Sequence, residues 1–185
     1  MRVIAGTARR LKLETPAGRH TRPTSDKIKE TLFNMIQQDL YDARFLDLFS
    51  GSGGIAVEAL SRGAAEAVMV DNDREALRCI RANLAHTHFE EQARVMAMDV
   101  IQALRRLDQQ GKAFDIIFMD PPYNHEFENR VLEYLSSSPM VTEDTLIIIE
   151  ASKETDFDWL SDAGFHMIKE KVYKTNKHIF AGKGA

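Results

Sequence analysis

The sequence has a single cysteine, Cys79, among its 185 residues. One thiol cannot close an internal disulfide, so a disulfide-stapled secreted fold is excluded and a reducing compartment is favoured. No apolar run approaches the roughly 18 residues that span a bilayer, and the N-terminus lacks the apolar core of a signal peptide. These absences predict a cytoplasmic protein that has no membrane partner.

Patterns typical of metal sites, serine hydrolases and repeat proteins are missing as well. The six histidines have no Cys or His partners at zinc-like spacing, so no metal site is predicted. Ser50 and Ser52 lack the G-x-S-x-G pattern of a nucleophile elbow. Without repeats or low-complexity linkers, a chain of this length most simply forms one main domain.

The charge of the chain is unevenly distributed. Residues 1–30 hold eight Lys or Arg and three Asp or Glu, although the whole chain carries a net charge of −4. A basic end on an acidic body is expected of a protein that contacts nucleic acid, although a solvated basic segment explains it about equally well. Residues 1–22 are interpreted as a basic β-hairpin arm and residues 23–185 as the main domain. The candidate nucleic-acid contacts on the arm are Arg2, Arg9, Arg10, Lys12, Arg19 and Arg22.

Short apolar runs alternate with helix-like stretches along the main domain. A capped helix is expected in "SDKIKETLFNMIQQDL", and the tail, "GFHMIKEKVYKTNKHIFAG", predicts two antiparallel strands at the end of a sheet. The alternation between them predicts an α/β, doubly wound fold, in which helices cover both faces of a mostly parallel sheet. The strands of that alternation are expected at 44–49, 66–70, 93–98, 114–119 and 145–150.

A glycine-rich turn, "DLFSGSGG", follows the first predicted strand. In doubly wound sheets, ligands bind beyond the carboxyl ends of the strands. Gly51 and Gly53 permit a tight turn and a close backbone approach to a ligand, although this pattern alone is weak evidence for a nucleotide-like cofactor. The carboxylate of Asp47 would repel a pyrophosphate and attract an ammonium group. The turn therefore favours a ligand that carries an amino group.

Acidic residues also end the second and third predicted strands. Asp71 stands 20 residues after Gly51, a spacing at which a carboxylate accepts hydrogen bonds from ribose, whereas Asp73 suits a helix cap. Asp99, followed by Val100, either accepts from an amine such as that of adenine or caps the next helix. Together the three strand-end acids describe a ligand with an amino acid, a ribose and an adenine but no phosphate. S-adenosylmethionine fits that description.

The fourth predicted strand ends on "DPPY", residues 120–123. An amine attached to an aromatic ring is a poor nucleophile, because its lone pair is delocalised into the ring. The Asp120 carboxylate and the Pro121 carbonyl can accept from both N–H bonds, and the fixed φ angles of Pro121 and Pro122 hold these acceptors in place. Tyr123 can stack on a base that has been flipped out of a helix. These residues predict methyl transfer to the amine of a base, without a metal.

The motifs "DLFSGSGG", "VDND", "MAMDV" and "IIFMDPPY" resemble those of class I S-adenosylmethionine-dependent amino-methyltransferases. "RVIAGTARRLKL" and "RPTSDKIKETLFNMI" are more narrowly similar to bacterial 16S ribosomal RNA guanine-N2 methyltransferases, the RsmD family. Arg10 and the pair Tyr173-Lys174 stand where members often have glycine or Tyr-Gly. These departures concern RNA contact rather than chemistry.

The resemblance covers essentially the whole chain and implies a Rossmann-like sheet of seven strands. It also implies that the chain methylates the N2 amine of one guanine in 16S rRNA. We expect this rRNA to lie within a small ribosomal subunit or an assembly intermediate, and we expect the chain to be a monomer. Asp47, Gly51, Gly53, Asp71, Asp99 and Val100 then bind the cofactor, and Asp120–Tyr123 bind the target base.

Three other functions are less compatible with the sequence. A DNA adenine-N6 methyltransferase uses the same D-P-P-Y chemistry, but the connections here leave no room for a target-recognition insert. A nucleotide-binding regulator or dehydrogenase would leave "DPPY" unexplained. A pure RNA-binding module would not need an acid at the end of every strand. Methyl transfer to the amino group of another base of DNA or RNA, such as the N6 of adenine, is therefore the closest alternative.

Overall fold

The computed structural model describes residues 1–16, 25–122 and 127–184. Three of the predicted site residues, Arg19, Arg22 and Tyr123, lie outside these ranges. The elements, in chain order, are α1 (Asp26–Met35), β1 (Arg44–Asp47), α2 (Gly54–Ser61), β2 (Glu66–Asp71), α3 (Arg74–Thr87), β3 (Ala93–Ala97), α4 (Val100–Asp108), β4 (Ile116–Met119), α5 (Phe127–Ser136), β5 (Leu146–Ser152), the 3-10 helix η1 (Asp158–Leu160), β6 (Phe165–Val172) and β7 (Asn176–Lys183).

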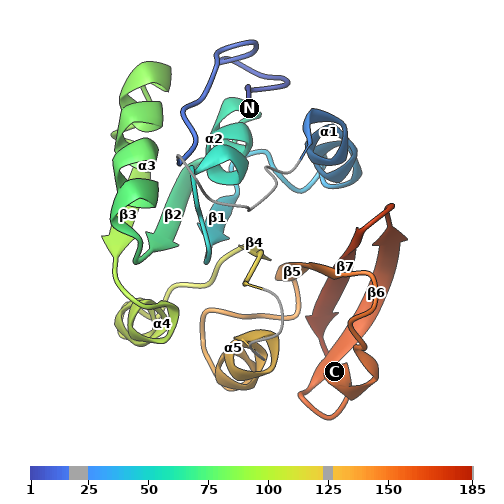
Figure 1. The fold of residues 1–185 in the computed structure, drawn as a ribbon. Coiled ribbons are helices and arrows are strands. Elements are labelled where there is room, and N and C mark those ends of the chain that lie inside the picture. The colour runs from blue at the N-terminus through green and yellow to red at the C-terminus, as the bar shows by residue number, and fades with distance from the viewer. Residues whose placement is uncertain (17–24, 123–126, 185) are drawn as a thin grey trace.

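The strands form one seven-stranded sheet in the order β3-β2-β1-β4-β5-β7-β6 (Figure 1). The first five strands pair in parallel, whereas β7 runs antiparallel to both of its neighbours. The predicted α/β, doubly wound class is confirmed, and so is its antiparallel C-terminal end. Because β2 lies on one side of β1 and β4 on the other, the strand order reverses between β1 and β4. This reversal is where a doubly wound sheet offers a ligand crevice.

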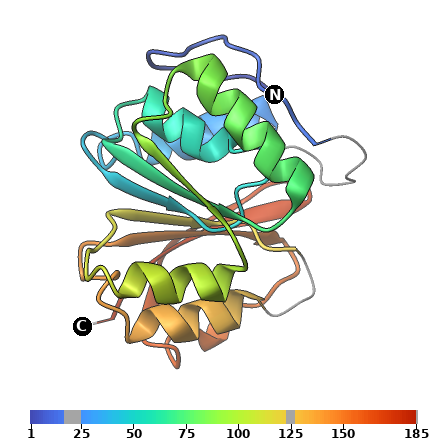
Figure 2. The ribbon, with the colours of Figure 1, turned by 90° about the vertical axis from the view of Figure 1, so that its left-hand side faces the viewer.

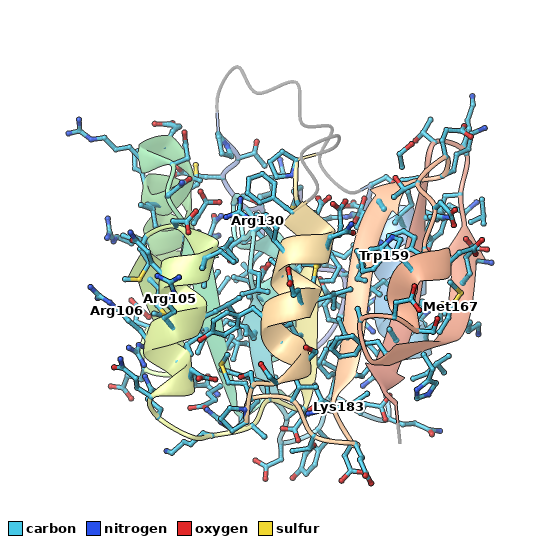
Figure 3. The ribbon with its side chains drawn as sticks, turned by 90° about the horizontal axis from the view of Figure 1, so that it is seen from below. Arg105, Arg106, Arg130, Trp159, Met167 and Lys183 are labelled. Carbon is cyan, nitrogen blue, oxygen red and sulfur yellow. The ribbon has the colours of Figure 1, made fainter. Side chains whose placement is uncertain are left out.

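Helices cover both faces of the sheet (Figure 2). On one face, Phe45 and Ile116 belong to the core beneath α1, α2 and α3; on the other, Leu46 and Ile117 belong to the core against α4 and α5. Alternating residues of one strand thus serve two cores, which explains why the strands are apolar throughout. Figure 3 views the α4 and α5 side, where Arg105 and Arg106 lie on α4 and Arg130 on α5.

Side chains cap the N-termini of α1 and α3. The Ser25 hydroxyl accepts a 3.3 Å hydrogen bond from the Ile28 amide at the start of α1. The Asp73 carboxylate accepts a 2.8 Å bond from the Ala76 amide at the start of α3. Both caps satisfy amides that the first helical turn leaves unpaired, as the sequence predicted. Among the described residues, no helix is long and apolar enough to cross a membrane.

Residues 1–3 of the N-terminal segment pair antiparallel with residues 10–13: the Val3 amide donates to the Leu11 carbonyl at 2.9 Å, and the Leu13 amide to the Met1 carbonyl at 3.0 Å. The only β-bridge of this segment among the described residues is antiparallel, between Arg2 and Lys12. The amides of Ile4 and Ala5 donate instead to the Glu58 carboxylate on α2, at 2.8 and 3.0 Å. A strand cannot pair through amides that are bonded elsewhere. The first part of the arm therefore lies fastened to the main domain.

Candidate active site

One cavity of about 1110 Å³ lies at the carboxyl ends of the central strands, and α1 contributes to its wall. A cavity of this size exceeds what a single drug-sized ligand needs, so it has room for more than one group. The four acids that the sequence placed at successive strand ends all line it: Asp47, Asp71, Asp99 and Asp120. Parallel strands therefore bring together side chains that lie more than 70 residues apart in the sequence.

Asp47 is the most deeply buried of these acids, at 1% exposure. Both of its carboxylate oxygens are buried without a hydrogen-bond partner of good geometry among the described residues. Burial, reinforced by the neighbouring Asp71 charge, raises the pKa of Asp47 to about 7. An unpartnered buried carboxyl needs a donor, and a bound ammonium would supply both the hydrogen bonds and the opposite charge.

The glycine turn after β1 is built around Gly51 and Gly53. Their φ angles are 55° and 78°, in the left-handed region that glycine adopts without strain. A Cβ on Gly53 would also lie 2.3 Å from the Met69 Cε, but this atom is the far end of a flexible side chain, so the positive φ is the stronger reason for glycine at this position. A Cβ on Gly51 would meet nothing within 4 Å, so this residue leaves space in front of the turn.

Asp71, at the end of β2, stabilises the glycine turn through hydrogen bonds. One of its oxygens accepts a 2.8 Å hydrogen bond from the Gly51 amide, and the other accepts one of the same length from the Asp73 amide. A carboxylate has about four acceptor positions, so Asp71 can still accept from a ligand. The sequence predicted a helix cap for Asp73 and a ribose contact for Asp71. Asp73 does cap α3. The predicted ribose contact of Asp71 stays a prediction.

Asp99 caps α4, which is the less specific of its two predicted roles. Its Oδ1 accepts hydrogen bonds from the Ile101 and Gln102 amides, at 2.9 and 3.4 Å. The adjoining Val100 is buried, and both residues line the cavity. The cap fixes the carboxylate at the cavity edge, where an adenine amine remains a compatible partner.

Asp120, Pro121 and Pro122 line the cavity beyond β4. Burial, followed by the charges of Glu150, Asp47 and Glu128, raises the pKa of Asp120 well above its usual range. A carboxyl group with a raised pKa binds a proton more readily than an exposed one. This property suits Asp120, once ionised, to take up a proton released nearby.

The described arm residues that were predicted to contact nucleic acid do not line this cavity. Arg9, Arg10 and Lys12 are exposed, and Arg2 forms a 2.8 Å ion pair with Asp26. None of these four lines the cavity, whereas Met1 and Thr15 of the same segment do. Any nucleic acid that touches both the arm and the cavity must therefore extend across the surface between them.

A buried charge cluster, which the sequence interpretation missed, fastens the arm to α1 and α2. The Glu58 carboxylate accepts a 2.8 Å bond from Arg62 and lies 3.2 Å from the Lys29 ammonium, with neither Lys29 nor Glu58 exposed. Burial lowers the pKa of Lys29, although Glu58 opposes this effect. Lys29 also donates to the Arg2 carbonyl. The motif "RPTSDKIKETLFN" therefore has a structural role, because it contains Lys29.

The far wall of the cavity was also missed. It includes Glu150 on β5, with Tyr173 and Asn176 from the turn into β7 and the start of that strand. Glu150 ends the predicted strand 145–150, so the rule that identified the other strand-end acids applied to it as well. Asn176 joins the wall only through the pairing of β7 with β5, which no local pattern predicts.

The described residues fit S-adenosylmethionine. Asp47 offers unpartnered oxygens to an ammonium, Gly51 leaves open space, and Asp71 and Asp99 offer further acceptors. Within the same described ranges, no group of three His, Cys, Asp or Glu side chains has the geometry to hold a metal.

Known proteins resemble this chain over nearly its whole length. The family model described as "Conserved hypothetical protein 95" matches residues 1–181. The "Putative rRNA methyltransferase YlbH" of Bacillus subtilis is 38% identical over 156 residues, which cover 84% of this chain and 85% of that protein. The "Ribosomal RNA small subunit methyltransferase D" of Escherichia coli is 34% identical over 172 residues, covering 93% and 84% respectively.

Solved structures agree with these relatives. The structure of "Putative methyltransferase yhhF from Escherichia coli" is 32% identical, with a TM-score of 0.86, and the alignment covers 100% of this chain and 98% of that one. The match extends through the N-terminal segment, the cavity-lining strand ends and the antiparallel C-terminal strands. The chain therefore belongs to the RsmD family of S-adenosylmethionine-dependent methyltransferases, as its motifs indicated.

Proposed function

We propose that this enzyme transfers a methyl group from S-adenosylmethionine to the N2 amine of one guanine in small-subunit ribosomal RNA. The observation that carries the proposal is that Asp120 and Pro121 line the same cavity as the unpartnered carboxylate of Asp47. In this proposal the donor site and the acceptor site for the transfer share that cavity. The relatives' names, which specify ribosomal RNA, support the substrate class.

In this proposal the chain positions the target amine beside the methyl donor and accepts the proton that the amine releases. Bound S-adenosylmethionine supplies a methyl group activated by its positive sulfonium. The Asp120 carboxylate and the Pro121 carbonyl accept from the two N–H bonds of the amine and free its lone pair for attack. The raised pKa of Asp120 suits it to accept the proton that the nitrogen releases. Pro122 keeps the turn rigid, and Tyr123 stacks on the base.

The basic arm supplies the RNA contact in this proposal. Arg9, Arg10 and Lys12 are exposed on the described part of the arm, and phosphate binding by such side chains is independent of sequence. Specificity for one nucleotide then depends on the shape of the surrounding RNA, which an assembling small subunit in the cytoplasm provides. We infer that one copy of the chain is sufficient, because Asp47, Asp71, Asp99 and Asp120 of the same chain all line the cavity.

Replacing Asp120 with Ala tests the assignment. We expect methyl transfer to fall by at least about a hundredfold, the size of effect typical of a general base, while calorimetry shows cofactor affinity within a few-fold of the wild type. Asp144→Ala, at an exposed site outside the cavity, is the matched control. An equal loss of transfer and of cofactor affinity would make Asp120 a structural residue.

The proposed substrate is tested with labelled S-adenosylmethionine. The enzyme is incubated with undermethylated small subunits or with naked rRNA, and the modified nucleotide is then mapped. Label on the N2 of a single guanine is expected. Label on an adenine N6 would support the alternative amino-methyltransferase and reject guanine specificity.

A further inference from the structure

The β5–β7 wall of the cavity carries a buried polar cluster that the proposed transfer does not use. Glu150 is 5% exposed, and its two oxygens accept hydrogen bonds from Asn176 Nδ2 at 2.6 Å and from His178 Nε2 at 3.1 Å. Glu150 also stands beside Asp120, one residue beyond the last paired residues of β4 and β5. Strand alternation places both carboxyls on the same face of the sheet. A fixed carboxylate therefore adjoins the residue that grips the target amine.

The side chains that contact Glu150 are arranged to donate hydrogen bonds to its carboxylate. The Tyr173 hydroxyl lies 3.3 Å from His178 Nδ1. Burial and the charge of Glu150 raise the pKa of Tyr173 to about 12, so its hydroxyl keeps the proton and can donate to Nδ1. When Nδ1 of His178 accepts that hydrogen bond, the ring hydrogen is on Nε2, which lies 3.1 Å from a Glu150 oxygen. This chain of donors leaves Glu150 as an acceptor.

Asn176 adds a second acceptor to the same wall. Its NH₂ group donates to Glu150, which fixes the amide orientation and turns Oδ1 away from the carboxylate. Oδ1 is buried and has no hydrogen-bond partner among the described residues. A buried polar atom without a partner on the wall of a ligand cavity indicates a donor that arrives with the ligand. The wall therefore offers acceptors, and a ligand must meet it with donors.

Guanine and adenine differ at the atom next to their amines. The N2 amine of guanine adjoins N1–H, a donor, whereas the N6 amine of adenine adjoins an N1 lone pair, an acceptor. Asp120 and the Pro121 carbonyl grip either amine equally well, so they cannot distinguish the two bases. A carboxylate beside them can, because it attracts N1–H and repels an N1 lone pair.

We propose that Glu150, held in place by His178 and Asn176, accepts the N1–H of the target guanine and thereby selects guanine over adenine. Glu150 is a specificity-determining residue in contact with the base, while His178 and Asn176 are positioning residues. Two of the roughly four acceptor positions of the carboxylate are taken by these partners, so positions remain for the base. This inference rests on the proposed guanine-N2 transfer and names the group that makes it selective.

The test compares guanine with 2-aminopurine, which keeps the N2 amine but lacks the N1 hydrogen. Each base is placed at the mapped nucleotide of rRNA assembled from ligated segments, and the kcat/KM ratio of the two substrates is measured. We expect the wild type to prefer guanine strongly. In Glu150→Gln an amide can donate to the N1 lone pair, so the ratio should fall by about tenfold or more, the value of one charged hydrogen bond.

Glu154→Gln is the matched control, because Glu154 is an exposed acid just beyond β5, and its ratio should stay unchanged. Asn176→Ala is a second variant, which removes one hydrogen bond that holds Glu150 and should lower the ratio in the same direction. It also keeps the test valid if Glu150→Gln folds poorly. Calorimetric cofactor affinity of each variant verifies the fold.

Each outcome decides a separate question. A lower ratio in the Glu150 or Asn176 variant, with cofactor affinity retained, supports the inference. Equal losses on guanine and 2-aminopurine would give Glu150 a structural role and overturn it. If the wild type leaves guanine unmodified, the proposed function fails as well, so the two failures are distinguishable.

Discussion

Replacing Asp47 with Asn should stabilise the ligand-free protein at pH 8 while weakening its binding of S-adenosylmethionine. The pKa of Asp47 is raised from 3.8 to about 7. Each unit of pKa difference corresponds to about 1.4 kcal/mol, so ionising this carboxyl costs the folded state about 4 kcal/mol. The folded protein holds one more proton than the unfolded chain between pH 4 and 7. Its stability therefore falls as the pH rises through that window.

Asn resembles the neutral carboxyl and has no such titration. We expect Asp47→Asn and the wild type to unfold at similar temperatures near pH 4, and the variant to melt on the order of 10 °C higher at pH 8. Calorimetry should show cofactor affinity at least about tenfold weaker, because the ammonium loses its charged partner. Asp144→Asn, at an exposed site, should match the wild type. A melting difference that does not change between pH 4 and pH 8 would refute the raised pKa.

Two further predictions concern the arm. Glu58→Gln should lower the free energy of unfolding by about 3–5 kcal/mol, because it leaves the Lys29 charge buried without its partner; denaturant titration would show this, and a loss below 1 kcal/mol would mean that Lys29 is already neutral. Replacing Arg9 and Arg10 together with Ala should weaken RNA binding and reduce its salt dependence, measured by filter binding across salt concentrations. An unchanged salt slope would make both residues part of a solvated surface.

The sequence was most informative where one residue type recurred at equivalent places in the fold. Alternating apolar runs predicted the sheet, and the acids after those runs predicted four of the cavity-lining side chains. The prediction was less accurate at turns: the run 44–49 was read as a strand, but β1 ends at Asp47, where the chain enters the glycine turn.

Long-range pairing accounts for what the sequence missed. Opposite Glu150 lies His178, 28 residues later, and this register depends on how β7 pairs with β5 rather than on a local pattern. Likewise, the pairing of residues 1–3 with residues 10–13 does not continue through the amides of Ile4 and Ala5, because a carboxylate more than 50 residues away accepts their hydrogen bonds. Such choices depend on competition between partners that only the folded chain brings together.

The gathering of Asp47, Asp120 and Glu150 also has a consequence for turnover. The methyl donor enters with a positive sulfonium, and the product, S-adenosylhomocysteine, leaves without that charge. Burial raises the pKa values of Asp47 and Asp120, and a nearby cation favours the ionised form of such carboxyls. We therefore expect the site to bind the charged donor more tightly than the neutral product. If these side chains bind the donor as proposed, the difference favours exchange of spent cofactor for fresh after each methylation.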